Sequence, residues 1–148
     1  LDLLLPSFRS ERVFVFLDAG SLSGRTHGGL ADIVLEDRSG PGYFGAGLAV
    51  GDLDGDGRDD VAVGAPGDDS VPATWATTEG RVYVWPSLDD VTLDAAEAPL
   101  TLVGMDVEDG FGMGLLSADL DGDGVDELVV GAPAALGGEG RVYAVSLD

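Results

Sequence analysis

The chain has 148 residues, enough for one domain with a substantial core, and its 45% hydrophobic content argues against disorder. Its 28 acidic and 7 basic residues give a formal net charge of −21, which repels nucleic acid and anionic membranes. The absence of cysteine excludes disulfides, thiol nucleophiles and zinc–thiolate sites, and no apolar run approaches the roughly 18 residues of a membrane span. We therefore expect neither a nucleic-acid partner nor membrane insertion.

The first 41 residues predict three strands, at 2–6, 12–16 and 31–35. They begin without an initiator Met and without the basic region of a signal peptide, so we expect a processed or excerpted piece of a longer protein. The only histidine, His27, lies in a Gly- and Ser-rich stretch. A solvated hairpin loop is favoured there over a catalytic base.

Four further short strands are predicted at 45–50, 60–65, 81–85 and 100–103. Along 81–85 valines alternate with aromatic residues, the period of a sheet with two different faces. We expect Tyr83, Trp85 and Tyr143 to pack between units. The pairs Asp68-Asp69 and Asp89-Asp90 are interpreted as solvated turns rather than acid–base pairs.

An acidic loop joins the strands predicted at 45–50 and 60–65, and a second copy follows 67 residues later. Between 52–66 and 119–133, eleven of the fifteen aligned residues are identical. Each copy has carboxylates at positions 1, 3, 5 and 9 and glycine at positions 4 and 6. The carboxylates are Asp52, Asp54, Asp56 and Asp60 in loop one, and Asp119, Asp121, Asp123 and Glu127 in loop two.

Carboxylates at this spacing repel one another unless a cation lies between them, and Ca²⁺ takes six to eight oxygen ligands at about 2.3–2.6 Å. Gly57 and Gly124 permit the positive φ that turns the position 7 carbonyls of Arg58 and Val125 inward. An EF-hand is excluded because position 12 is valine and a strand, not a helix, follows. We predict two structural Ca²⁺ ions; the alternative is an acidic Asp-Gly hairpin without metal.

The repetition predicts an all-β propeller fragment of about two and a half blades, each blade having four antiparallel strands. The predicted units are 1–41, a partial blade with strands two to four; 42–104, a complete blade with a calcium loop; and 105–148, a partial blade with strands one to three and a calcium loop. Strands of the last unit are predicted at 112–117, 127–132 and 141–146. Asp2 takes the place of position 9 in a loop that would precede residue 1.

The chain resembles the FG-GAP repeat, the blade unit of the integrin α-subunit β-propeller. Phe44-Gly45 and Gly64-Ala-Pro66 carry the resemblance, and so do Phe111-Gly112 and Gly131-Ala-Pro133, with an acidic calcium signature between each pair. Glu127 departs from the final Asp of that signature but can still reach a cation. In that family about seven blades close a ring, whereas the residues here account for about two and a half blades. The resemblance implies calcium loops on one face of the blades, and in the family partners often dock on the opposite face.

These observations predict a calcium-stabilised extracellular β-propeller module for adhesion, recognition or scaffolding, without catalytic or organic-cofactor-binding residues. The alternative is the non-catalytic propeller portion of a secreted hydrolase or lyase. In the loop 67–79, Trp75 is a candidate to stack on a sugar or anchor a protein partner, and the alternative is that it covers a blade edge. We also expect neighbouring blades, from the same parent chain or from other copies, to cover the terminal units.

Overall fold

The computed structural model describes residues 3–7, 10–17, 29, 31–39, 42–67, 79–86, 88 and 92–147. These residues form three β-sheets and almost no helix, which confirms the predicted all-β fold of propeller blades. The strands are β1 (Leu3–Ser7), β2 (Arg12–Phe16), β3 (Ile33–Glu36), β4 (Leu48–Gly51), β5 (Asp60–Ala65), β6 (Arg81–Trp85), β7 (Thr92–Asp94), β8 (Leu100–Val103), β9 (Gly114–Ala118), β10 (Glu127–Ala132) and β11 (Arg141–Val145).

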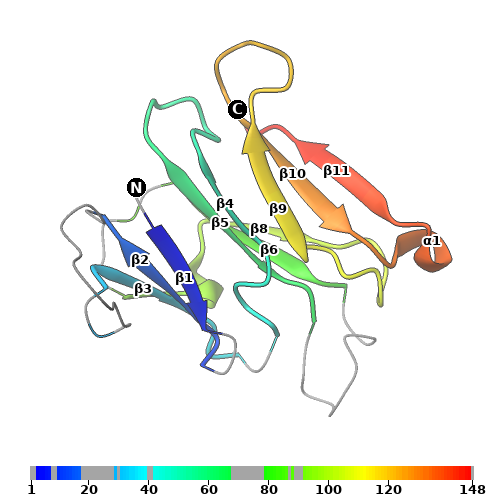
Figure 1. Cartoon of the computed structure of the whole chain (residues 1–148), viewed down its shortest axis with the longest axis horizontal. Coiled ribbons are helices and arrows are strands. Elements are labelled where there is room, and N and C mark those ends of the chain that lie inside the picture. Colours follow the sequence, from blue (N-terminus) through cyan, green and yellow to red (C-terminus); the bar gives the residue numbers. More distant parts are fainter. Residues whose placement is uncertain are drawn as a thin grey trace.

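The three sheets lie side by side, with the second sheet between the first and the third (Figure 1). The first has the strand order β1-β2-β3-β7, the second β4-β5-β6-β8 and the third β9-β10-β11. Neighbouring strands within each sheet are antiparallel, apart from β3 and β7, which pair in parallel. The described part of the chain contains no helix with the length and hydropathy of a membrane span.

All of the predicted strands are present, but the first strand of each acidic repeat begins later than predicted. β4 begins at Leu48 rather than at residue 45, and β9 begins at Gly114 rather than at residue 112. The Phe-Gly pairs form turns instead, because Gly45 and Gly112 have φ angles of 94° and 88°, which a strand does not adopt.

One strand, β7, was not predicted from the sequence. After β6 the chain returns to the first sheet, where Val34 to Glu36 pair with Thr92 to Asp94, before β8 rejoins the second sheet. Arg38 lies 3.5 Å from Asp94 and also pairs with Glu36, so an ion pair helps to hold this short parallel strand. Another unpredicted element, α1 (Ala135–Gly138), is a distorted turn in which Leu136 and Gly137 have positive φ.

The second sheet is buried on both faces. On β6, Tyr83 and Trp85 enter the apolar cluster shared with the first sheet, and Val82 and Val84 enter the cluster shared with the third. The strand β5 is buried at all six positions. The expected packing of Tyr83 and Trp85 between units is therefore observed, and Tyr143 packs against the second cluster with its ring centroid 5.4 Å from that of Phe111.

The second and third sheets approach each other closely at glycines. A Cβ atom placed on Gly64 would lie 1.9 Å from the carbonyl oxygen of Gly112, and one on Gly47 would lie 2.6 Å from the same oxygen. No side chain fits in so short a gap, so backbone packs directly on backbone. The Phe-Gly turn at Gly112 thus packs against the Gly-Ala-Pro strand of the preceding repeat at Gly64.

Candidate metal centres

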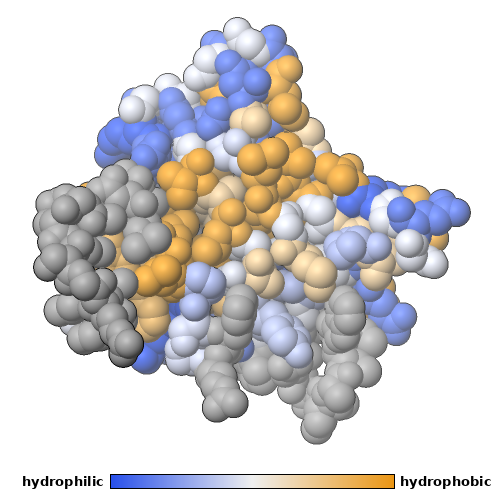
Figure 2. Space-filling model, in the orientation of Figure 1, coloured by the Kyte–Doolittle hydropathy of each residue, from blue (hydrophilic) through white to orange (hydrophobic). Residues whose placement is uncertain are grey.

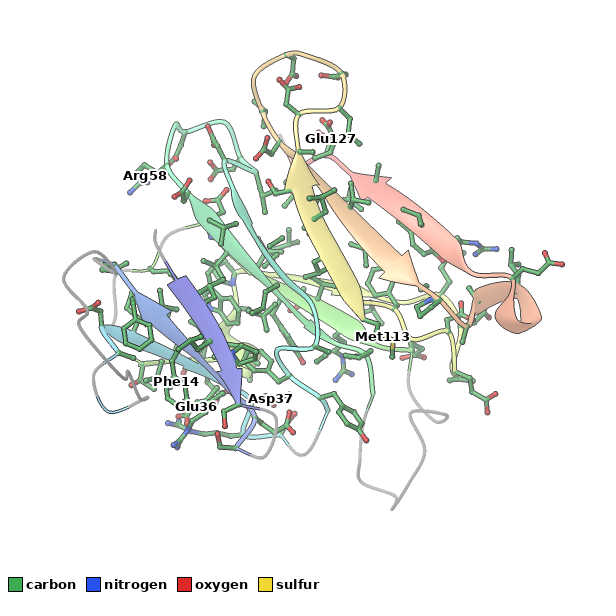
Figure 3. All side chains as sticks on the ribbon, viewed as in Figure 1. Phe14, Glu36, Asp37, Arg58, Met113 and Glu127 are labelled. Carbon is green, nitrogen blue, oxygen red and sulfur yellow. The ribbon has the colours of Figure 1, made fainter. Side chains whose placement is uncertain are left out.

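The two acidic loops lie at the same end of the molecule, loop one between β4 and β5 and loop two between β9 and β10. In Figure 3, Arg58 of loop one and Glu127 of loop two mark this end, whereas Met113 marks the opposite end of β9. The antiparallel pairing of β9 with β10 and of β4 with β5 brings the first and ninth positions of each loop together at the strand ends.

Hydrogen bonds inside each loop fix its shape. The Asp52 carboxylate accepts from the N–H groups of Gly55 and Gly57 at 2.8 and 2.9 Å. The Asp119 carboxylate accepts from Gly122 and Gly124 at 2.7 and 3.1 Å. All four glycines have φ between 78° and 96°, so the loop fold needs residues without a Cβ atom at positions 4 and 6.

The structure brings together the carboxylates of positions 1, 3 and 9. In each loop, one oxygen from each of these three side chains lies within 4.8 Å of the other two. The two clusters are Asp52, Asp54 and Asp60 in loop one, and Asp119, Asp121 and Glu127 in loop two. Three converging anionic oxygens at this separation match the donor set of a hard divalent cation.

The carboxylates of position 5 are not members of these clusters. Asp56 accepts from the Arg58 side chain, with its Oδ2 atom 2.8 Å from Nε, and this bond is the main reason that the pKa of Asp56 is lowered. In loop two, the Oδ1 atom of Asp123 accepts from the Val125 N–H at 2.8 Å. Asp56, Asp123 and the carbonyls of Arg58 and Val125 therefore remain predicted ligands that the clusters do not include.

Asp60 is the most deeply buried carboxylate in the described part of the chain. Its side chain is fully buried, and its Oδ2 atom accepts from Leu53 N–H at 2.7 Å and from Asp54 N–H at 3.2 Å. Its Oδ1 atom is buried and has no hydrogen-bond partner among the described atoms. Burial raises the pKa of Asp60, against the lowering effect of the Leu53 N–H, and the nearby Asp54 raises it further. A buried anionic oxygen is costly unless a positive group meets it, so this site fits a cation.

Loop two repeats the arrangement in a more open setting. Glu127 is half-buried, and its Oε2 atom accepts from Leu120 N–H at 2.8 Å, the counterpart of the bond from Leu53 to Asp60. Leu53 is fully buried, whereas its counterpart Leu120 is 58% exposed. Leu53 belongs to the core that the second sheet shares with the third, so the third sheet covers the base of loop one.

Several residues singled out in the sequence lie outside the described residues. They are Asp2, His27, Asp68, Asp69, Trp75, Asp89 and Asp90. The sequence did not reveal that Asp60 would be more buried than Glu127. That difference depends on which neighbouring sheet covers each loop, and the local sequence holds no signal for it.

Comparison with known proteins supports a repeat architecture. The FG-GAP repeat model matches residues 44–85 and 111–145, which together include both acidic loops. The chain is 41% identical over 105 residues to the phosphatidylinositol-glycan-specific phospholipase D of Rattus norvegicus, covering 71% of this chain and 12% of that protein. It is 40% identical over 94 residues to integrin alpha-IIb of Homo sapiens, covering 62% of this chain and 9% of that protein.

A third relative is integrin alpha-PS2 of Drosophila melanogaster, 32% identical over 93 residues, with 62% of this chain and 6% of that protein covered. The chain thus spans only a small part of the curated relatives that it matches. The matched residues are those that build the Phe-Gly turns, the acidic loops and the Gly-Ala-Pro strands. The chain belongs to the FG-GAP repeat family.

Proposed function

We propose that this chain is a calcium-stabilised extracellular β-propeller module that serves adhesion, recognition or scaffolding. The observation that carries the proposal is the buried Asp60 carboxylate, whose Oδ1 atom has no hydrogen-bond partner among the described atoms and which converges with Asp52 and Asp54. The same three positions converge again in loop two. Sites of modest affinity are filled where Ca²⁺ is abundant, which favours the extracellular side.

In this proposal the chain supplies almost all of the ligands. Asp52, Asp54 and Asp60 hold the first ion, and Asp119, Asp121 and Glu127 hold the second. Asp56 and Asp123 complete the two carboxylate sets, together with the carbonyls of Arg58 and Val125. Each bound ion supplies positive charge that offsets the repulsion among the carboxylates. Its role is structural, because the ring of protein oxygens leaves little reason for an open substrate position.

Calorimetric titration of chelator-treated protein tests this proposal. We expect two Ca²⁺ ions per chain, with dissociation constants on the order of 10⁻⁶ to 10⁻³ M. Asp54→Ala and Asp121→Ala should each remove one ion, because each deletes one carboxylate of a single cluster. Absence of calcium uptake by the wild-type chain would contradict the proposal.

We further propose that the chain comprises units 1–41, 42–104 and 105–148 and that a neighbouring blade covers the third sheet. Val82 and Ala49 of the second sheet are buried against the third. Their counterparts in the third sheet, Val142 and Leu116, are 70% and 57% exposed. An exposed apolar sheet face of this kind is typical of a repeat that lacks its neighbour. The covering blade comes from the same parent chain or from another copy.

A recognition role has support at the end opposite the acidic loops. A pocket of about 340 Å³ is lined, among the described residues, by Tyr43, Ala46, Pro66 and Met113. Its volume falls within the range of small-ligand pockets, and its lining suits an apolar group of a protein or carbohydrate ligand. Carbohydrate and peptide arrays probed with the wild-type chain and with Met113→Glu test this. We expect binding that the substitution abolishes, and equal binding of the two proteins would remove this pocket from the proposal.

The second candidate is the non-catalytic propeller portion of a secreted hydrolase. Its support is the 41% identity to a phospholipase D over 105 residues. The sequence of the full gene discriminates between the two candidates, because an adjoining catalytic domain supports the hydrolase and a surface anchor supports the adhesion module.

A further inference from the structure

The two acidic loops contact each other directly across the boundary between the second and third sheets. The N–H of Asp126 in loop two donates to the carbonyl oxygen of Asp52 in loop one at 2.8 Å. Asp52 contributes a carboxylate to the first cluster, and Glu127, the residue after Asp126, contributes one to the second. A single backbone hydrogen bond therefore joins the ligand sets of the two candidate sites. Figure 1 shows the two loops next to each other at the top of the molecule.

Side-chain contacts reinforce this bond. The Ser117 hydroxyl donates to the Oδ2 atom of Asp126. Both side chains pack against the backbone of Gly51, the residue before Asp52. A Cβ atom on Gly51 would lie 1.9 Å from the Ser117 Oγ and 2.1 Å from the Asp126 Oδ2. Farther along loop one, a Cβ atom on Gly55 would lie 3.1 Å from the Val125 Cγ2. Loop two is thus fitted against the bare backbone at both sides of Asp52.

The third sheet also buries the base of loop one. Leu53 is fully buried in the core between the two sheets, and its N–H donates to the buried Asp60 carboxylate. The counterpart Leu120 is exposed, because no described sheet covers loop two in the same way. Loop one is therefore complete only when the third sheet and loop two are in place.

We infer that the two sites bind Ca²⁺ as a coupled pair, so that an ion in one loop raises the calcium affinity of the other. The coupling acts through the contact of Ser117 and Asp126 with the backbone of Gly51 and Asp52. The inference rests on the proposed calcium binding. An ion in either loop fixes that loop's backbone, and the partner loop then orders at a smaller entropic cost, so each ion raises the affinity for the other. Repulsion between the two cations opposes this effect, and added salt weakens it, because the Debye length is about 8 Å at physiological ionic strength.

The test follows each site separately by the amide resonances of Gly57 and Gly124, whose N–H groups donate to the position 1 carboxylates. The Glu127→Gln substitution disables loop two. We expect the calcium affinity reported by Gly57 to fall about fivefold or more in this variant, the range of typical coupling between sites. The Asp54→Asn substitution should lower the affinity reported by Gly124 by the same factor, because coupling is reciprocal.

The route is tested with Gly51→Ala, in which the new methyl group displaces the Ser117–Asp126 pair. In the Gly51→Ala protein, Glu127→Gln should leave the calcium affinity reported by Gly57 nearly unchanged. Gly114→Ala is the matched control, since a Cβ atom on Gly114 meets nothing within 4 Å and should leave the effect unchanged. Ser117→Ala is a second variant at the contact, with no added bulk. Hydrogen exchange at the Asp126 amide should also slow when calcium fills loop one alone.

The outcomes separate the inference from the proposal beneath it. Two ions that bind with independent affinities would overturn the coupling and leave calcium binding intact. Coupling that persists in both Gly51→Ala and Ser117→Ala would overturn the route through this contact. No calcium response at either glycine would overturn the proposed function, and the inference with it.

Discussion

At the scale of single residues, the burial of the Asp60 carboxylate is the main physical argument for the proposed calcium binding. Its side chain is fully buried, and only one of its two oxygens accepts hydrogen bonds among the described residues. Burial raises its pKa, so the native state disfavours the charged form. Because the folded-state pKa lies above the unfolded-state value, the charge destabilises the calcium-free protein at neutral pH. This destabilisation disappears as the pH falls below the unfolded-state pKa of Asp60, because the carboxyl is then protonated in both states.

The Asp60→Asn substitution should therefore have opposite effects in the two conditions. In excess chelator we expect a higher melting temperature than wild type, because a buried charge is removed while an oxygen that accepts from Leu53 N–H remains. In calcium we expect a lower melting temperature, because the first ion no longer binds. At 100 times the dissociation constant one ion contributes about 2.7 kcal/mol. Differential scanning calorimetry measures both.

Glu97→Gln provides the control for that experiment, because it removes a charge from an exposed side chain in the 3-10 turn at Ala95–Glu97. We expect it to change neither melting temperature by more than a degree or so, since such surface substitutions are worth about 0.5 kcal/mol or less. An Asp60→Asn protein less stable than wild type in chelator would show that the carboxylate is not destabilising.

Residue spacing predicted that the carboxylates of positions 1, 3, 5 and 9 converge in each loop, and in the structure those of positions 1, 3 and 9 lie together. The carboxylate periodicity and the two glycines determine the loop, and these features are local. Spacing alone did not predict that Asp56 would pair with Arg58. That pairing depends on a basic residue at position 7, and loop two has Val125 there.

At the scale of elements, the sheets approach each other through glycines in β5 and in the Phe-Gly turns. We predict that Gly64→Ala destabilises the protein by several kcal/mol, a loss seen only for severe steric or buried-polar defects. Its Cβ atom would lie 1.9 Å from the Gly112 carbonyl oxygen, which cannot move without shifting the third sheet. Urea denaturation measures the loss.

Gly131→Ala is the matched substitution at the equivalent position of the third sheet. The nearest atom to its Cβ would be the Gly114 carbonyl oxygen at 3.5 Å, an ordinary contact. We expect a change of about 0.5 kcal/mol or less in the isolated chain. Equal losses in the two variants would mean that backbone crowding does not explain the glycine in Gly-Ala-Pro.

Strand positions were largely predictable because period-two patterns and turn residues are local signals. β5, β6, β8 and β10 have the predicted bounds. β7 was missed because three residues, Thr92 to Asp94, are too few to define a strand period, and this strand is stabilised by pairing with β3 and by Arg38, both distant in sequence. A short strand of this kind depends on tertiary contacts more than on its own residues.

At the scale of the whole molecule, the third sheet carries an apolar face that its counterpart in the second sheet buries. In Figure 2 apolar side chains form a broad band across the middle of the visible surface, and the loop at the top is mostly hydrophilic. We predict that the isolated chain self-associates in light scattering and that Val142→Thr, which makes an exposed position polar, reduces association.

The equivalent substitution in the second sheet, Val82→Thr, separates association from folding. Val82 is fully buried, so a hydroxyl there should destabilise the fold by roughly 1–3 kcal/mol without restoring a monomer. A wild-type chain that stays monomeric at high concentration would show that the third sheet needs no covering blade.

The most direct measurement of the central claim is an anomalous difference map from crystals grown in calcium. Two peaks are predicted, one in each loop, at about 2.3–2.6 Å from the carboxylate oxygens of positions 1, 3, 5 and 9. In loop one, Asp56 should then point to the ion and no longer accept from Arg58. A map without a peak between Asp52, Asp54 and Asp60, with Asp56 still bound to Arg58, would contradict the account.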